Sequence, residues 1–236
     1  MEPSRLADPR FVKAFSEIAA RIAVPLAQAD RKSLPVRMYL AGGTAVHLYT
    51  GARSNGDVDA VFSQRMLLPD DLDVNYVDAS GRPRLIYFDR QYNDTFGLMH
   101  DNAHDDSIPL IIFGVDPKVL EVRLLSPVDL AVSKIARFEE HDQRDLTSLA
   151  TQGLITADAV ILRAEEAVGG YVGNIERVRN SIVLAAQLIA AAQPRNISTQ
   201  GRDDSGFRQR LLFQVRRAAK RPPFAEATKR EPKPDS

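Results

Sequence analysis

The chain places a short strand, a glycine turn, a helix and an acidic strand in immediate succession, and this order restricts its fold more than any other feature. Residue patterning predicts a strand at Val36–Leu40, a turn at Gly42–Thr44, a helix at Ala45–Thr50 and a second strand at Asp57–Phe62. Strands that alternate with helices are typical of α/β units. The sequence therefore predicts an α/β core built around this strand, turn and helix.

Two aspartates on the second strand give this unit its chemistry. Successive side chains of a strand alternate between its faces, so Asp57 and Asp59 are expected side by side, with Val58 on the opposite, core-facing side. Two neighbouring carboxylates repel each other unless a cation joins them. Mg²⁺ prefers oxygen ligands and is usually completed by water and substrate phosphates. We therefore predict a Mg²⁺ site at Asp57 and Asp59.

The glycine turn supplies the other half of the predicted site. Gly42 and Gly43 lack side chains and, with Thr44, lead into a helix N-terminus, where backbone N–H groups are free to contact phosphates. A Gly-Gly turn alone is most often structural, and an Asp-x-Asp on a solvent-facing strand is most often a surface feature. Their coupling favours a cradle for a metal ion and a triphosphate.

The remaining elements complete the predicted fold class. Hydrophobic periodicity predicts a helix at Pro9–Val24, which Pro25 ends or kinks, and a hairpin between Leu72–Val77 and Arg84–Phe88. Further strands are expected at 109–115 and 119–125, and helices at 127–140, 143–151, 156–167 and 173–192. The prediction is an α/β (α+β) fold: a short mixed sheet with flanking helices, followed by a helical C-terminal half.

Charge is balanced over the whole chain but not along it. Residues 195–236 contain 11 basic and 5 acidic residues, a net charge of +6, so residues 1–194 carry −6. Within this tail, the basic segment Phe207–Arg221 indicates either a short helix with a solvated face or a grip on nucleic-acid phosphates. We expect a catalytic core at 1–126, a helical subdomain at 127–194 and a basic, partly disordered tail at 195–236.

Composition and missing motifs exclude several functions. The chain has no cysteine, which rules out disulfides, thiolate zinc sites and a cysteine nucleophile. Its longest apolar stretch is far shorter than the roughly 20 residues that a bilayer requires, so we expect a cytoplasmic protein with no membrane partner. The glycine-rich motifs of Walker ATPases and dinucleotide enzymes and the Gly-x-Ser-x-Gly of hydrolases are also missing.

The glycine turn and the acidic strand together resemble a known signature. The runs that carry the resemblance are Gly42-Gly43-Thr44-Ala45 and Arg53-Ser54-Asn55-Gly56-Asp57-Val58-Asp59. They are similar to the motif of the nucleotidyltransferase superfamily, and in particular to its AbiEii-type and DUF6036-type branches from bacterial toxin–antitoxin and phage-defence loci. Residues 126–134 and 143–146 are similar to the helix of these branches that carries one lysine and to their later Arg-Asp. The resemblance covers residues 36–155.

The resemblance implies a role for each matching residue. Asp57 and Asp59 would hold Mg²⁺ beside the nucleotide phosphates. Lys134 would reach the phosphates as a point charge, and Asp145 would orient that lysine or contact the base or sugar. The alternatives are a solvent-facing helix residue for Lys134, and a helix cap or a surface ion pair for Asp145. The nucleotide itself would be bound by Gly42, Gly43, Thr44, Arg53, Asn55 and Lys134. Asn55 stands where many relatives carry Ser, which changes the hydrogen-bond donors at that position.

A third carboxylate is expected from the superfamily on a later strand. Glu121, within the strand predicted at 119–125, is the best candidate, both as a metal ligand and as a catalytic group. Without a carboxylate there, the general base for the acceptor hydroxyl is missing. The fold would then be a non-catalytic module that binds nucleotide or a partner protein. The position of Glu121 relative to Asp57 and Asp59 distinguishes the two readings.

The implied reaction moves a nucleoside monophosphate from an NTP to an acceptor and releases pyrophosphate. The acceptor stays open between a tRNA 3′ end or other RNA, a protein hydroxyl and a small molecule, and the basic tail favours RNA. A cognate antitoxin or another partner protein is a further expected partner.

Two other groups of residues have a weaker claim to function. The cluster Tyr87, Phe88, Tyr92 and Phe96 indicates either a wall for a base or, preferably, a core or lid. The run His100–Asp106 offers two imidazoles four residues apart, for which a solvated turn is favoured over a metal site.

Overall fold

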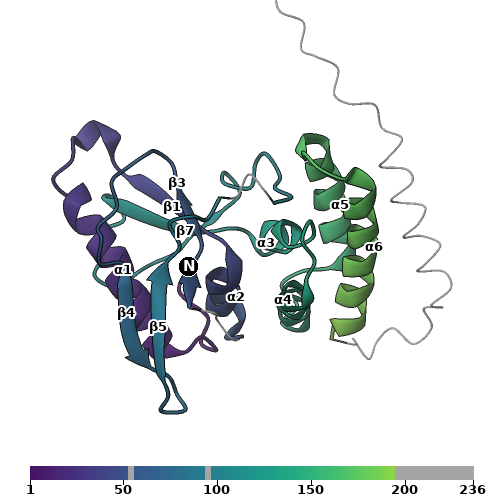
Figure 1. Cartoon of the computed structure of the whole chain (residues 1–236), viewed down its shortest axis with the longest axis horizontal. Coiled ribbons are helices and arrows are strands. Elements are labelled where there is room, and N and C mark those ends of the chain that lie inside the picture. The colour runs from purple at the N-terminus through teal and green to yellow at the C-terminus, as the bar shows by residue number, and fades with distance from the viewer. Residues whose placement is uncertain (53–55, 94–96, 195–236) are drawn as a thin grey trace, which may run out of the picture.

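The computed structural model describes residues 1–52, 56–93 and 97–194, and within them it combines short mixed sheets with flanking helices (Figure 1). The predicted α+β class is confirmed. The helices are α1 (Pro9–Leu26), η1 (Arg31–Ser33), α2 (Gly42–Thr50), α3 (Pro127–Ser133), α4 (Glu140–Thr151), α5 (Ala157–Ala167), η3 (Val168–Gly170) and α6 (Ile175–Ala192). The strands are β1 (Val36–Leu40), β2 (Asp57–Val58), β3 (Ala60–Phe62), β4 (Asp73–Val77), β5 (Pro83–Phe88), β6 (Ile108–Pro109) and β7 (Leu120–Leu124).

The strands form two sheets that meet near the start of α2. The larger sheet has the order β3-β1-β7-β6, with β1 parallel to β7 and antiparallel to β3. In the smaller sheet, β2-β5-β4, the predicted hairpin is present as the antiparallel pair β4 and β5, and β2 runs parallel to β5. The chain passes from one sheet to the other between β2 and β3.

This passage corrects the prediction of one continuous strand at 57–62. The carbonyl of Val58 accepts a hydrogen bond from the Asp89 N–H at 3.1 Å, which belongs to the smaller sheet. The next carbonyl, that of Asp59, accepts from the Ala41 N–H at 2.9 Å and belongs to the larger sheet. Asp59 therefore lies at the junction of the two sheets, where no single ladder can continue.

An amphipathic helix covers the sheets on one side. The apolar residues of α1 recur every three or four positions, and Phe11, Phe15, Ile18 and Ile22 are fully buried against β4, β5 and β7. Pro25 lies inside the last turn of the helix, where it removes one N–H donor, and the helix continues only to Leu26.

The helical half gathers into a separate lobe that α2 joins to the sheets (Figure 1). We call α1 with β1–β7 the sheet lobe and α3–α6 the helical lobe. Helix α2 follows β1 directly and packs against β2 as well as against α3 and α4. It begins at Gly42, three residues before its predicted start, and ends at Gly51, whose φ of +72° suits a glycine C-cap. The division into domains at residues 126 and 194 stays a prediction.

Two more boundaries differ from prediction. The helix expected at 127–140 starts as predicted, with Ser126 as N-cap and Pro127 in the first turn, but it stops at Ser133. A turn through 134–138 then leads into α4, and Phe138 in that turn has a φ of +52°. The strand expected at 109–115 is confined to β6; after it the Leu110 N–H still donates to the Val122 carbonyl of β7, and the Ile111 N–H donates to the Met1 carbonyl. No helix in the described part of the chain is long and apolar enough to cross a membrane.

Candidate functional site

The junction of the two sheets brings Asp59 against the first residue of α2. Gly42 has a φ of +59°, and a Cβ atom built on it would lie 1.7 Å from Oδ2 of Asp59. Such a separation is far inside van der Waals contact, so this position accepts glycine alone. The carboxylate of Asp59 therefore lies directly beside the helix N-terminus, as the order of the motifs in the sequence led us to expect.

Substituting Gly42→Ala is expected to break this arrangement. The methyl group would occupy the place of the Asp59 carboxylate, and an L-residue in the left-handed region adds strain, so we expect a loss of about 2 kcal/mol or more in unfolding free energy. Urea unfolding measures it. Gly81→Ala is a matched control because Gly81 also has a positive φ, of +80°, but open space around its Cβ position. Equal losses in the two variants would contradict the close approach of Asp59.

The second aspartate is held by the same helix. The hydroxyl of Thr44, which is fully buried, donates to the backbone carbonyl of Asp57 at 2.6 Å. Thr44 therefore positions β2 with its side chain, and only its backbone N–H is left to contact a phosphate. Oδ1 of Asp57 is buried and has no hydrogen-bond partner among the described residues. A buried carboxylate oxygen without a donor is costly, and a cation would satisfy it.

A third aspartate, which the sequence reasoning missed, lies beside the first two. Because β2 pairs with β5 in the register Val58 with Phe88, the next residues on the two strands, Asp59 and Asp89, are neighbours. The charge of Asp89 raises the pKa of Asp59. The signal in the sequence is an acidic residue directly after an apolar strand. Strands β3 and β4 lie between β2 and β5 in the chain, so residue spacing does not predict that β2 and β5 pair.

Asp57, Asp59 and Asp89, which we call the acidic group, carry negative charge that the surrounding residues offset only in part. Burial, followed by the charges of Asp57 and Asp89, raises the pKa of Asp59 to about 6, and the more distant charges of Lys134 and Arg137 offset only part of this. Perturbed carboxylates of this kind cluster at functional sites. Among the described residues no group of three or more His, Cys, Asp or Glu side chains is placed to hold a metal ion. The residues fit a Mg²⁺ bound by two carboxylates and completed by phosphates and water.

Glu121 does not belong to this group, and its predicted role as third carboxylate is corrected. Glu121 lies on β7, opposite Arg37 of β1. Arg37 is four residues before Ala41, whose N–H donates to the Asp59 carbonyl. Four residues of a strand span about 13 Å. Its carboxylate is instead bound by Arg37 at 3.1 Å and by Arg123 at 2.7 Å. Glu121 therefore neutralises two arginines on the sheet face.

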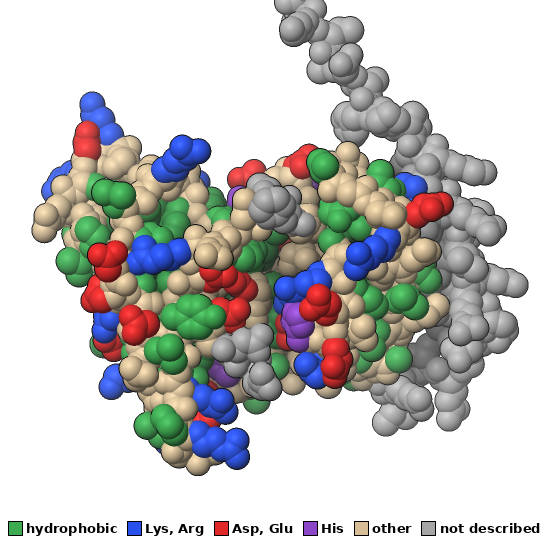
Figure 2. Space-filling view, in the orientation of Figure 1, with side chains coloured by type: hydrophobic (Ala, Val, Ile, Leu, Met, Phe, Trp, Pro, Cys, Tyr) green, Lys and Arg blue, Asp and Glu red, His purple; other side chains and the backbone are tan. Residues whose placement is uncertain are grey.

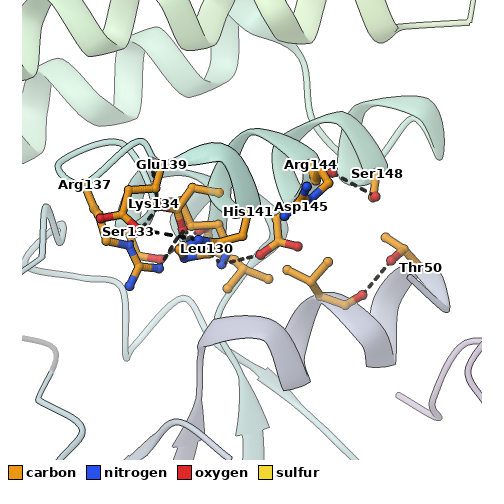
Figure 3. A network of polar contacts seen from close by, with 12 residues as sticks. Thr50, Leu130, Ser133, Lys134, Arg137, Glu139, His141, Arg144, Asp145 and Ser148 are labelled. Atoms are coloured by element: carbon orange, nitrogen blue, oxygen red, sulfur yellow. Dashed lines mark hydrogen bonds and ion pairs between the residues drawn. The ribbon is translucent and has the colours of Figure 1, made fainter. Parts of the chain in front are cut away.

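Lys134 and Asp145 form a buried ion pair at the turn between α3 and α4 (Figure 3). Nζ of Lys134 lies 2.6 Å from Oδ2 of Asp145 and 3.8 Å from Oδ1 of Asp142. The side chain of Lys134 is only 5% exposed. The solvent-facing alternative for this lysine does not hold in the structure, and Asp145 contacts it as the orienting role requires. Their action on a nucleotide stays a prediction.

The two walls of the site differ in charge. In Figure 2, a group of acidic side chains on the sheet lobe lies across a hollow from a mixed group of Lys, Arg, His and acidic side chains on the helical lobe. Tyr87, opposite Asp57 in the β2–β5 pair, is 44% exposed, whereas Phe88 is buried and stacks on Phe62. The aromatic cluster is thus divided between an exposed ring at the site and a core ring. Phe96, Arg53 and Asn55 lie outside the described residues.

The two histidines of the run His100–Asp106 have separate partners. The ring of His104 stacks on Tyr39 with centroids 4.2 Å apart, and Nε2 of His100 lies 3.5 Å from Glu166. Residues 101–106 form turns, in agreement with the favoured interpretation.

Comparison with known proteins supports the motif-based expectation. A family model described as a nucleotidyltransferase of unknown function (DUF6036) matches residues 14–181. The matched range contains the glycine turn, the acidic group and the Lys134–Asp145 pair. No curated protein and no solved structure matches the chain. Since the match spans most of the chain, this protein belongs to the DUF6036 family of nucleotidyltransferases of unknown function.

Proposed function

We propose that the protein is a Mg²⁺-dependent nucleotidyltransferase, which moves a nucleoside monophosphate from an NTP to a hydroxyl acceptor and releases pyrophosphate. One observation carries the proposal: the Asp59 carboxylate lies against the first residue of α2, and a buried oxygen of Asp57 has no hydrogen-bond donor among the described residues. Membership of a nucleotidyltransferase family supports the same class.

Each wall of the site has a part in the proposed reaction. Asp57 and Asp59 hold the metal, and the free N–H groups at the start of α2 face the phosphates. A Mg²⁺ held by these two carboxylates would supply positive charge that offsets the charge of the pyrophosphate leaving group. Lys134 adds a fixed charge on the opposite wall.

Asp89 takes the place that the sequence assigned to Glu121. It is the third carboxylate beside Asp57 and Asp59, and we propose that it accepts the proton of the attacking hydroxyl. The hydroxyl oxygen then forms its bond to the α-phosphorus, the bond from that phosphorus to the bridging oxygen breaks, and pyrophosphate leaves with the electron pair. This restores the catalytic reading that depended on a third carboxylate.

The acceptor we favour is RNA. The net charge of +6 on residues 195–236 suits a polyanion, and the body of the chain, with −6, does not attract one by itself. The resemblance to branches from toxin–antitoxin and phage-defence loci supports a role in such a locus, with a cognate antitoxin as partner protein.

A labelling experiment tests the reaction. The protein is incubated with each α-³²P-labelled NTP, Mg²⁺ and, separately, total RNA, protein extract or a small-molecule pool. We expect label in the RNA fraction, release of pyrophosphate, and a fall of about 1,000-fold or more in the Asp57→Asn/Asp59→Asn variant. Asp70→Asn, an exposed aspartate in the loop before β4, is the control and should label normally.

Two outcomes would contradict the proposal. Equal labelling by the double variant and the parent would show that the acidic group is not the site. Tight NTP binding without pyrophosphate release, in the presence of every acceptor pool, would favour the non-catalytic module.

A further inference from the structure

The turn between α3 and α4 carries a second cation, Arg137, next to Lys134 (Figure 3). The turn is unusual because Phe138, directly after Arg137, has a φ of +52°, which a bulky residue rarely adopts. Strained backbone of this kind persists where surrounding contacts fix it, often at ligand sites. Here it lies between α3 and α4, directly after Arg137.

A buried carboxylate fixes the orientation of this arginine. Nε and Nη2 of Arg137 donate to the two oxygens of Asp142, at 2.9 and 2.8 Å, in a two-pronged pair. Asp142 is fully buried and also accepts the N–H of Glu139 at 3.0 Å. Burial by itself would raise the pKa of Asp142, but the hydrogen bonds from Arg137 and Glu139 and the charge of Lys134 hold it below its ordinary value. Asp142 is therefore an ionised anchor.

Arg137 is the accessible cation of the helical lobe at this site. Its side chain is 57% exposed, whereas that of Lys134 is 5% exposed and closed by Asp145. Asp142 occupies only two of the five N–H donors of the guanidinium, and no other hydrogen bond of Arg137 is seen among the described residues. The charges of Arg137 and Asp59 also act on each other, lowering the pKa of Asp59 and raising that of Arg137. The two side chains are therefore close enough for their charges to interact, and the exposed guanidinium has donors left for a ligand.

We infer that Arg137 binds the β- and γ-phosphates of the NTP and so holds the pyrophosphate leaving group, while Asp142 is a positioning residue that aims it. This inference rests on the proposed function. The α-phosphate belongs at the acidic wall, where metal and acceptor meet, so the phosphates beyond it extend towards the helical lobe. A guanidinium with one edge anchored and the other open is preorganised for such a phosphate pair. Lys134, whose side chain is 5% exposed and paired with Asp145, contributes a fixed charge but is less accessible to a ligand.

The experiment compares nucleotides with and without these two phosphates. Affinities for the α,β-methylene NTP analogues, which cannot transfer, and for the matching NMPs are measured with Mg²⁺ by equilibrium dialysis. In Arg137→Gln the affinity for the NTP analogue should fall about 10–100-fold, and that for the NMP should stay within about twofold. Arg137→Lys should lose less. Arg144→Gln is the matched control, because Arg144 lies on α4, is exposed and pairs with Glu140.

The outcomes separate this inference from the function that it builds on. Unchanged analogue affinity in Arg137→Gln overturns the inference, and so does an equal fall for analogue and NMP, which indicates a structural role. Asp142→Asn should reproduce the selective loss with Arg137 still present. Should the parent protein bind no NTP analogue more tightly than the NMP, the proposed function fails and the inference with it. Thermal unfolding of each variant identifies a folding defect, and in that case Arg137→Lys decides.

Discussion

Replacing Asp59 with Asn is expected to stabilise the metal-free protein at pH 8 by about 1–3 kcal/mol, while it removes nucleotidyl transfer. The carboxylate is buried beside two other aspartates, which raises its pKa to about 6 from 3.8. An amide of the same shape carries no charge and avoids both penalties. A carboxylate that weakens the fold at the centre of the site is expected to have a role other than stability.

The pH dependence follows from the direction of the shift. Well below pH 3.8 the carboxyl is protonated in both the folded and the unfolded chain, and it contributes no difference. Between pH 3.8 and about 6 the folded chain binds more protons than the unfolded chain, so stability falls as pH rises. The advantage of Asp59→Asn should therefore be absent near about pH 2, grow towards pH 6 and stay constant above about pH 7.

Urea unfolding in EDTA at several pH values measures this effect. Asp70→Asn, which changes an exposed aspartate, should leave the unfolding free energy within about 0.5 kcal/mol at every pH. A loss of stability in Asp59→Asn at pH 8 would show that the carboxylate is already well compensated inside the protein. The site would then have no deficit for a metal ion to fill.

The second large effect is expected at Lys134. Substituting Lys134→Met leaves Asp145 without its partner in a nearly closed space, which should cost about 3–5 kcal/mol. The added variant Lys134→Met/Asp145→Asn removes the orphaned charge as well and should recover at least half of this loss. Transfer should stay absent in both variants, because neither restores the charge of Lys134.

Chemical denaturation with a parallel labelling assay separates the two effects. Lys118→Met, which changes an exposed lysine, is the control and should leave both stability and transfer near those of the parent. A stability loss below about 1 kcal/mol in Lys134→Met would contradict a buried ion pair at this place. Recovery of transfer in the double variant would contradict a role for the lysine charge.

The part of the site that the sequence predicts best is the part built from neighbouring residues. Gly42 and the Asp57 and Asp59 pair lie within one strand–helix–strand unit, whose geometry follows from local patterning. Even here the prediction of one continuous strand at 57–62 was wrong. The strand is split, because the carbonyls of Val58 and Asp59 accept hydrogen bonds from different sheets. A split of this kind depends on where distant strands pair, and no local pattern encodes it.

The third carboxylate shows the same limit more sharply. Glu121 lies within an apolar strand and Asp89 directly follows one, so residue type and local pattern do not distinguish them. The pairing of the strands determines which carboxylate reaches the site. Strand β5 pairs with β2, which brings Asp89 close to Asp59, whereas β7 pairs with β1 so that Glu121 lies opposite Arg37. The same limit applies to the basic residues Lys134 and Arg137. Lys134 stands out by motif, but only its burial shows that Arg137 is the cation left open to a ligand.

The proposed function requires that Asp57 and Asp59 bind a divalent ion together with a nucleotide. Mn²⁺ replaces Mg²⁺ at oxygen sites and loses its free-ion electron paramagnetic resonance signal on binding, so it reports occupancy directly. With an α,β-methylene NTP analogue present, the parent protein should retain about one Mn²⁺ per chain beyond that held by nucleotide alone. The Asp57→Asn/Asp59→Asn variant should retain none. Equal Mn²⁺ retention by the parent and the double variant would contradict the proposed metal site.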